Sequence, residues 1–227
     1  MKIIGHRGAR GLVEENTEDS LEAAIQHGVD EVEIDVRVTK DGIVVLSHDP
    51  FVWDGGGHKL VIATTDSSAL FEAKPELVRL EVAILKVRRR VPLIIEIKPG
   101  EPIEAVVRII QHYMKDKKYS NEDFLVASFD YRLLKAFRQR LPQIGVIVNE
   151  RWSGIRATSR ARRLRTRRIA MNQRWLWSGF ISNMRRGNWL LSAYTLNDPN
   201  KVRRWQHDGL FGVITDNPDR FEDRLLK

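Results

Sequence analysis

The stretch EVEIDVRVTKDG, residues 31–42, alternates polar and apolar side chains with a strict period of two. In an extended strand, the apolar residues from Val32 to Val38 share one face, and Glu33 and Asp35 lie together on the other. A polar strand face can be turned either to water or into a functional site. The fold around this strand therefore decides what the two acids do.

Short β-branched segments recur along the rest of the chain, most of them separated by a segment with helical periodicity. The expected strands are residues 2–5, 29–38, 92–97, 124–128, 145–148, 168–172, 189–195 and 211–215, and the expected helices are residues 17–27, 103–115, 131–140, 175–186 and 198–207. This alternation predicts an α/β protein with parallel strands and crossover helices. Eight such units fit a TIM-type (β/α)8 barrel of about 250 residues better than an open doubly wound sheet, which is the alternative.

One connection is longer than the others. More than fifty residues separate the second expected strand from the third, and they contain the short strand IVVLSHD, the glycine-rich turn DGGGHK and a helical stretch around residues 67–90. We interpret this segment, at about residues 43–90, as a small insertion after the second strand. The chain is then a single domain over residues 1–227.

The composition is that of an ordinary globular protein, with 227 residues of which 42% are hydrophobic. There is no cysteine, which excludes disulfides, thiolate metal ligands and thiol redox chemistry. The first residues, MKIIGHRG, lead directly into an expected strand, and no apolar stretch approaches the roughly 18 residues of a membrane span. We therefore expect a soluble, cytoplasmic protein.

The positive charge is concentrated in one segment. The formal net charge is +8, and residues 151–188 contain eleven arginines and no Asp or Glu. This segment could be a solvated helix face, a nucleic-acid patch or a contact with an anionic membrane surface, and Trp152, Trp175 and Trp177 would suit either interface. We favour the solvated face, because charged helices commonly cover a barrel. We therefore expect no nucleic-acid partner, keep weak membrane contact as an open alternative, and assign no oligomeric state.

The strand at residues 92–97 repeats the alternation of the opening stretch. Ile95 and Ile97 share one face, and Glu96 and Lys98 share the other. Because the outer face of a barrel must be apolar to receive helices, the polar face of each strand is expected to point into the barrel. Catalytic groups of such barrels lie at the C-terminal ends of the strands, where most of the expected strands of this chain end in polar residues.

Three inward carboxylates, Glu33, Asp35 and Glu96, cannot all stay ionised in a partly buried site without either a raised pKa or a bound cation. Oxygen ligands without cysteine favour Mg²⁺ or Ca²⁺ over zinc. Together with Arg7 and Lys98, such a cation makes a site for an anion, most naturally a phosphate. Arg7 and Lys98 could also be salt-bridge partners of the acids, or serve in both ways.

Two histidines at expected strand or loop ends, His6 and His48, can supply a proton donor and acceptor near neutral pH. Taken singly, each could be an ordinary turn or buried histidine, but their occurrence with the acids favours catalysis. Asp49 either orients His48 or begins a turn, and Tyr194 either stacks on a substrate or fills the barrel top. We interpret Asn197 and Asp216 as capping residues.

Several motifs together resemble the glycerophosphodiester phosphodiesterase family over nearly the whole chain. They are HRG followed by ENT, EIDVRVTKDGIVVLSHD, EIK, YTLND and GVITDNP. The resemblance implies a TIM-type barrel that hydrolyses glycerophosphodiesters to glycerol 3-phosphate and an alcohol with a divalent cation. The roles that it implies are metal ligands at Glu33, Asp35 and Glu96, general acid and base at His6 and His48, and phosphate contacts at Arg7 and Lys98.

The chain departs from the family pattern at three places. Glu14 replaces the usual proline before the ENT glutamate, Tyr194 replaces the usual Trp, and FVWDGGG replaces the usual arginine-threonine run after HD. None of these positions is an expected metal ligand or proton-transfer residue, so they bear on the choice of substrate. Two other functions compete: a phospholipase-like phosphodiesterase acting on intact lipid, and a non-catalytic anion-binding barrel.

Overall fold

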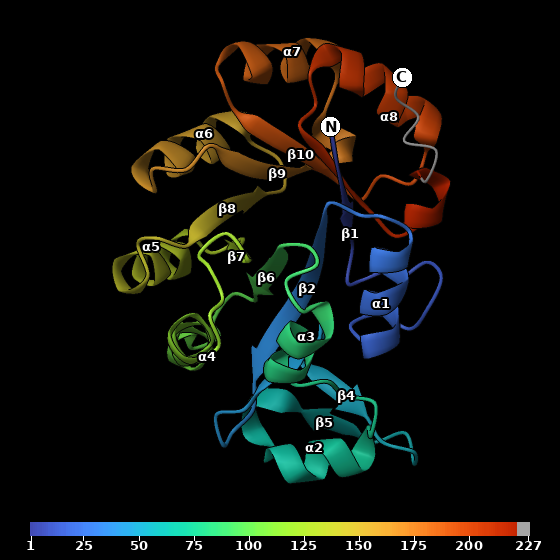
Figure 1. Ribbon diagram of the computed structural model, residues 1–227, viewed down its shortest axis with the longest axis vertical. Coiled ribbons are helices and arrows are strands. Elements are labelled where there is room, and N and C mark those ends of the chain that lie inside the picture. The colour runs from blue at the N-terminus through green and yellow to red at the C-terminus, as the bar shows by residue number, and fades with distance from the viewer. Residues whose placement is uncertain (222–227) are drawn as a thin grey trace.

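The structure is a computed structural model that describes residues 1–221. Within these residues, eight parallel strands close into a barrel in the order β1-β11-β10-β9-β8-β7-β6-β2, and β2 pairs again with β1 (Figure 1). The β1–β2 pairing excludes the open doubly wound sheet, because an open sheet leaves its two edge strands unpaired. The prediction of a TIM-type barrel is confirmed.

The barrel strands follow the predicted sequence order. They are β1 (Lys2–Gly5), β2 (Glu31–Val38), β6 (Leu93–Ile97), β7 (Phe124–Ser128), β8 (Gly145–Glu150), β9 (Arg168–Asn172), β10 (Leu190–Tyr194) and β11 (Gly212–Thr215). The helices between them lie on the outside of the strands in Figure 1. They are α1 (Glu18–Gln26), α3 (Leu80–Val87), α4 (Ile103–Asp116), α5 (Tyr131–Arg140), α6 (Gly154–Arg163), α7 (Ser178–Arg186) and α8 (Pro199–Asp208).

Helix α6 was not among the expected helices. Its N-cap, Ser153, accepts a hydrogen bond from the backbone N–H of Arg156, and its buried face consists of Ala157 and Ala161. Two alanines four positions apart give a weak periodic signal among so many arginines. The predicted helix at residues 175–186 also starts too early, because a short 3₁₀ turn at Gln173–Trp175 precedes α7.

The register of two neighbouring strands brings the acids together. β2 and β6 pair in parallel, with Asp35 opposite Glu96 and Glu33 opposite Ile94. Ile94 belongs to the apolar cluster inside the barrel, so the alternation places the three acids on that inner side as well. The polar face of the opening stretch is therefore turned into the barrel, as its pattern predicts.

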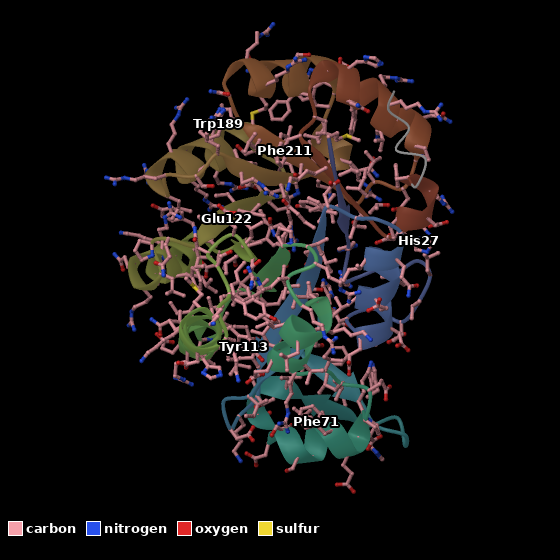
Figure 2. All side chains as sticks on the ribbon, viewed as in Figure 1. His27, Phe71, Tyr113, Glu122, Trp189 and Phe211 are labelled. Atoms are coloured by element: carbon pink, nitrogen blue, oxygen red, sulfur yellow. The ribbon has the colours of Figure 1, made fainter. Side chains whose placement is uncertain are left out.

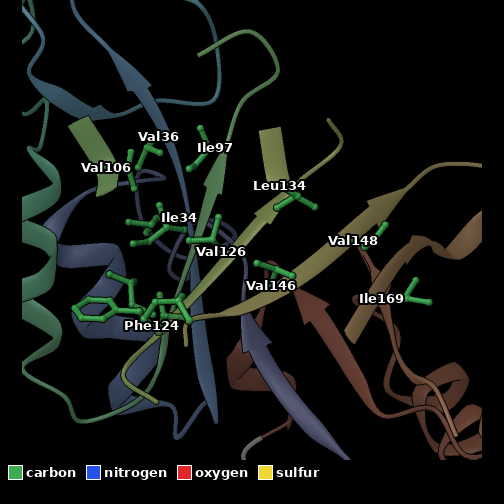
Figure 3. Packing of buried hydrophobic residues seen from close by; sticks show 14 of the residues in the cluster. Ile34, Val36, Ile97, Val106, Phe124, Val126, Leu134, Val146, Val148 and Ile169 are labelled. Carbon is green, nitrogen blue, oxygen red and sulfur yellow. The ribbon is translucent and has the colours of Figure 1, made fainter. Parts of the chain in front are cut away.

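Most of the hydrophobic core lies between the barrel wall and the helices. Ile34 and Val126 of the wall are fully buried in one cluster with Val106 of α4 and Leu134 of α5 (Figure 3). A smaller cluster inside the barrel contains Ile4, Ile94, Ala127, Ile147, Ala170 and Ile214. The outer cluster fixes the wall, and the inner one forms the floor beneath the acids.

The long connection after β2 begins with β3 (Val44–Leu46), which pairs antiparallel with β2. A two-stranded sheet of β4 (Phe51–Trp53) and β5 (Lys59–Val61) and a helix, α2 (Ser67–Ala73), follow. They enclose a small core of their own, which is Val45, Val52, Ile62, Leu70 and Leu77. Phe71, labelled in Figure 2, packs against this core.

Helix α3 returns the chain to the barrel, where it lies beside α1 (Figure 1). A single domain over residues 1–227 with an insertion at about residues 43–90 stays a prediction. Across residues 1–221, no helix has both the length and the apolar character that crossing a bilayer requires.

Candidate active site

Three buried carboxylates form the centre of the site. One ligand oxygen from each of Glu33, Asp35 and Glu96 lies within 4.8 Å of the others. Glu33 Oε2 accepts the backbone N–H of Arg7 at 2.9 Å, whereas Glu33 Oε1 is buried without a hydrogen-bond partner among the described residues. An orphaned carboxylate oxygen beside two further carboxylates is a donor set that fits a hard divalent cation.

Two cationic side chains balance these acids. The Lys98 ammonium contacts Asp35 and lies 2.5 Å from Glu96 Oε1. Arg7 Nε lies 2.9 Å from Asp35 Oδ2, and the Arg7 guanidinium also donates to Glu15 at 2.7 Å. The salt-bridge role that the sequence left open for Arg7 and Lys98 is therefore present in the structure.

The charges of the centre shift its pKa values in opposite directions. Burial, with Asp35 and Glu96 nearby, raises the pKa of Glu33 well above its usual value. Burial also acts to raise the pKa of Asp35, but Lys98 and Arg7 outweigh it and leave that pKa lowered. The Lys98 pKa is raised because Glu96 and Asp35 outweigh the effect of burial. The centre thus holds one more negative charge than it can readily keep, which a cation would relieve.

Two asparagines for which the sequence predicts no role in the site support the acids. Asn149 of β8 donates to Glu96 Oε2 at 2.7 Å. Asn16 accepts the backbone N–H of Asp35 at 3.1 Å and donates to its Oδ2 at 3.3 Å. Asn16 stands in the ENT motif, for which the sequence predicts no place in the site, whereas Asn149 lies near the end of the apolar strand β8 without any motif.

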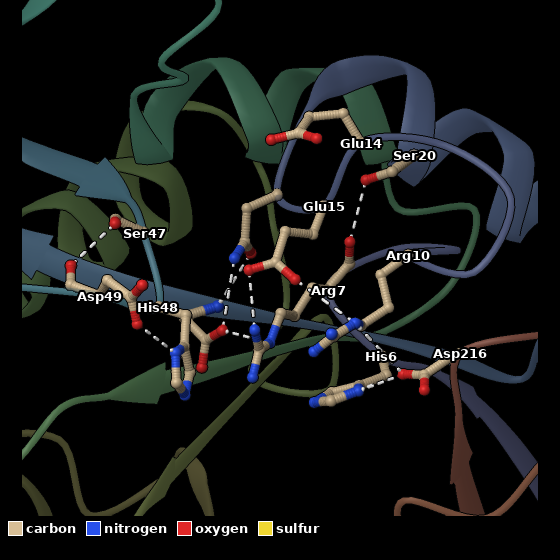
Figure 4. Close-up of polar contacts among 12 residues, drawn as sticks. His6, Arg7, Arg10, Glu14, Glu15, Ser20, Ser47, His48, Asp49 and Asp216 are labelled. Carbon is tan, nitrogen blue, oxygen red and sulfur yellow. Dashed lines mark hydrogen bonds and ion pairs between the residues drawn. The ribbon is translucent and has the colours of Figure 1, made fainter. Parts of the chain in front are cut away.

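His6 directly follows β1, and an aspartate that directly follows β11 holds its ring in place. His6 Nδ1 lies 2.6 Å from Asp216 Oδ1 (Figure 4). Asn197 fixes Asp216 by donating to its Oδ2 and accepting its backbone N–H, each at 2.9 Å. Burial acts to raise the pKa of Asp216, but hydrogen bonds from His6 and Asn197 leave it lowered. A carboxylate at Nδ1 fixes the ring and leaves Nε2 for chemistry.

The interpretation of Asn197 and Asp216 as capping residues is wrong. The N-cap of α8 is Asp198, whose side chain accepts from the backbone N–H of Asn200. Asn197 and Asp216 instead bind each other beside His6. The position of Asp216 at a strand end was the one signal in the sequence that pointed to this place.

His48 lies on the rim, after β3. Its Nδ1 is 2.8 Å from Asp49 Oδ1, so the orienting role considered for Asp49 is present (Figure 4). Its side chain is 42% exposed, against 15% for His6. The His48 carbonyl accepts two hydrogen bonds, at 3.1 and 2.8 Å, from Arg37, which also pairs with Glu101 at 2.9 Å. Arg37 therefore connects the His48 loop to β2 by hydrogen bonds.

These groups open into one cavity of about 410 Å³ at the C-terminal end of the strands. Its lining includes all eight predicted site residues: His6, Arg7, Glu33, Asp35, His48, Glu96, Lys98 and Tyr194. Phe129, Arg151 and Trp152 form part of the wall. Tyr194 donates through its hydroxyl to the Glu150 carbonyl at 2.9 Å, and its ring meets Phe129 edge-on at 5.9 Å. The ring of Tyr194 is thus fixed in the wall of the cavity.

The fold and the cavity define a (β/α)8-barrel enzyme in which one cavity holds three clustered carboxylates and two histidines. The sequence model of the glycerophosphoryl diester phosphodiesterase family matches residues 6–220, and the chain belongs to this family. It is a hydrolase that cleaves glycerophosphodiesters. The family depends on a divalent metal, for which the three acids form a suitable site.

Relatives agree with this assignment over the full length. A glycerophosphodiester phosphodiesterase of Bacillus subtilis is 26% identical over 251 residues, which cover 96% of this chain and 84% of the relative. A solved glycerophosphodiester phosphodiesterase of Thermotoga maritima is 25% identical, with a TM-score of 0.81 and coverage of 99% and 98%. A phosphodiesterase of Oleispira antarctica in complex with the product sn-glycerol-3-phosphate has a TM-score of 0.86 at 24% identity, with coverage of 100% and 97%, and supports the fold.

Proposed function

We propose that this chain hydrolyses small glycerophosphodiesters to glycerol 3-phosphate and an alcohol, with His6 and His48 as the proton-transfer groups. The observation that supports this most directly is the single cavity that joins both histidines to the three acids. The Oleispira antarctica phosphodiesterase, solved in complex with the product sn-glycerol-3-phosphate, is consistent with the same product here.

Glu33, Asp35 and Glu96 would hold a divalent cation that prefers oxygen ligands, Mg²⁺ or Ca²⁺. Bound there, the cation supplies positive charge that stabilises the phosphodiester as its charge shifts in the transition state. The orphaned Oε1 of Glu33 and the raised pKa of that residue support this assignment.

Arg7 and Lys98 bind the non-bridging oxygens of the phosphodiester in this proposal. Both line the cavity while they pair with the acids, so each presents further N–H donors to an anion beside the carboxylates. The ring of Tyr194, fixed by its bond to the Glu150 carbonyl, packs against the glycerol carbons.

The two histidines differ in their surroundings, and we assign their roles from this difference. His6 is the more buried, and its Asp216 partner is held by Asn197, so His6 is suited to take a proton from the nucleophile. His48 lies on the open rim, where an alcohol can leave, so it is suited to protonate the departing alkoxide.

The nucleophile is either water or the neighbouring hydroxyl of the glycerol moiety, and the second route forms a cyclic phosphate. Phosphorus NMR of the reaction separates them, because a cyclic phosphate signal that rises and then falls indicates attack by the hydroxyl. A direct conversion to glycerol 3-phosphate indicates attack by water.

The central test is the release of glycerol 3-phosphate from a panel of glycerophosphodiesters, with and without a chelator, for the native chain and for His6→Ala. We expect both the chelator and the substitution to abolish release. Activity that survives both would refute the mechanism. A matched variant, His112→Ala, removes an exposed histidine of α4 that pairs with Asp116, and should retain full activity. A cytoplasmic location stays a prediction.

A further inference from the structure

Four large apolar side chains are exposed near the mouth of the cavity. The exposed fractions are 59% for Trp152, 86% for Ile155, 52% for Trp175 and 62% for Trp177. They come from the segments that follow β8 and β9, which are neighbouring parallel strands. Both segments therefore lie at the C-terminal end of the barrel, where the cavity opens.

The two segments are packed against each other. The ring of Phe180, in the first turn of α7, lies 5.3 Å from the ring of Trp177. The same ring covers Gly154 of α6 so closely that a Cβ there would come within 2.5 Å of it. We call the exposed side chains that flank this contact the aromatic rim: Trp152, Ile155, Trp175 and Trp177.

The charge beside the aromatic rim is positive. Arg151 lines the cavity mouth, Arg174 is exposed and directly precedes Trp175, and residues 151–188 contain no acid. The nearby Glu150 is buried and paired with Arg156 at 2.7 Å, so it does not offset the other arginines. Arg186, by contrast, lies at the C-terminal end of α7. A crossover helix runs back along the barrel, so this end is remote from the mouth.

Tryptophan beside arginine suits the boundary between water and an anionic lipid layer. The indole ring is apolar with one polar edge and accumulates at that boundary, and each arginine adds electrostatic attraction to anionic headgroups. We propose that the aromatic rim docks the mouth of the barrel on an anionic membrane surface. The rim includes Trp152, which also lines the cavity, so docking brings the active-site opening to the level of the lipid headgroups.

The docking test is vesicle flotation of the full chain, without substrate, on phosphatidylcholine vesicles with and without phosphatidylglycerol. We expect binding to the anionic vesicles and little to the neutral ones. Ile155→Ser combined with Trp177→Ser should weaken binding at least about tenfold, because each substitution removes apolar area that the membrane would bury. A matched double variant, Leu85→Ser with Val61→Ser, removes exposed apolar residues outside the rim and should bind as the native chain does.

A pair of arginine variants tests the charge. Arg174→Gln should weaken binding to the anionic vesicles about fivefold, whereas Arg186→Gln should leave it unchanged. Equal binding to neutral and anionic vesicles, or native binding by the rim variant, would overturn the proposal. So would a dimer in sedimentation equilibrium that the rim substitutions dissociate while no vesicle binding is seen, because the rim would then join two copies of the chain.

Two further measurements show whether a loss of vesicle binding comes from the rim itself. Ile155→Ser alone, at the most exposed position, should also weaken binding, and this covers the case in which Trp177→Ser disturbs its contact with Phe180. The kcat/KM of the rim variant on a soluble glycerophosphodiester should match that of the native chain. Vesicle binding is measured without substrate, so a failure of docking and a failure of the proposed function give different results.

Discussion

His6 and Asp216 are 210 positions apart in the sequence and lie 2.6 Å apart in the structure. The contact exists because β1 and β11 pair in parallel and both residues follow the ends of these strands. The contact fixes the imidazole in the cavity that the three acids also line.

We expect Asp216→Asn to lower kcat by about 10- to 100-fold with little change in KM, because the substitution removes the group that orients His6. Steady-state kinetics on a soluble glycerophosphodiester measures both constants. Asp219→Asn, a nearby substitution beyond the His6 contact, should leave both near native values. A rise in KM with unchanged kcat would contradict an orienting role.

Arg37 should affect catalysis through the His48 loop. Arg37→Ala removes both hydrogen bonds to the His48 carbonyl, so we expect kcat to fall about 10- to 100-fold as the imidazole loses its fixed position. Arg37→Lys keeps one donor and the charge and should recover part of the loss. Full activity of Arg37→Ala would show that catalysis does not depend on the two hydrogen bonds to the His48 carbonyl.

Cation binding should be detectable without substrate, as a rise in the thermal midpoint of unfolding. Saturating Mg²⁺ or Ca²⁺ should raise the thermal midpoint of the native chain by about 5–10 °C, because the ion binds the folded site. Differential scanning calorimetry should show a smaller rise for Glu96→Gln. Glu72→Gln, an exposed substitution on α2, should respond like the native chain. An equal rise in all three proteins would place the ion elsewhere.

Asp41, which links Thr39 to Ser67 of the insertion, should make the stability of the protein sensitive to acid. Hydrogen bonds from Thr39 and Ser67 lower its pKa to about 2. A lowered folded-state pKa contributes stability above the usual aspartate pKa, and that contribution is lost as the pH falls through about 2. The free energy of unfolding should therefore drop over this window in the native chain by about 1 kcal/mol or less, because the exposed carboxylate is screened by solvent.

Urea denaturation at several pH values compares this drop with that of Asp41→Asn, which should lack it. The control is Asp66→Asn, at an exposed residue whose ion pair is with Lys40. If the free energy of unfolding of Asp41→Asn falls with pH as steeply as that of the native chain, other carboxylates cause the acid sensitivity.

The barrel and its acidic centre could be predicted because both follow from local patterns. A period of two in β2 and β6 sets which face is apolar, and a parallel register then brings Glu33, Asp35 and Glu96 together. The rest depends on tertiary contacts that leave little local signal. Helix α6 buries only two alanines, and Asp216 acquires its partner only when the two ends of the chain meet.

The hairpin of β4 and β5 is another element that leaves little local signal in the sequence. Its strands have three residues each, and the glycine-rich turn between them was recognised without them. Such short strands carry too few alternations to be distinguished from a loop. Their pairing is supported by the small core of the insertion, which sequence pattern alone does not reveal.

Strand β1 lies between β2 and β11, so β1 completes its hydrogen bonding only when β11, some 200 residues further along the sequence, has joined the sheet. Until residues 212–215 are available, the growing sheet has open edges and His6 has no Asp216 beside it. Closure of the fold and completion of the candidate site are thus one event. A chain that lacks β11 therefore has neither a closed barrel nor an oriented His6.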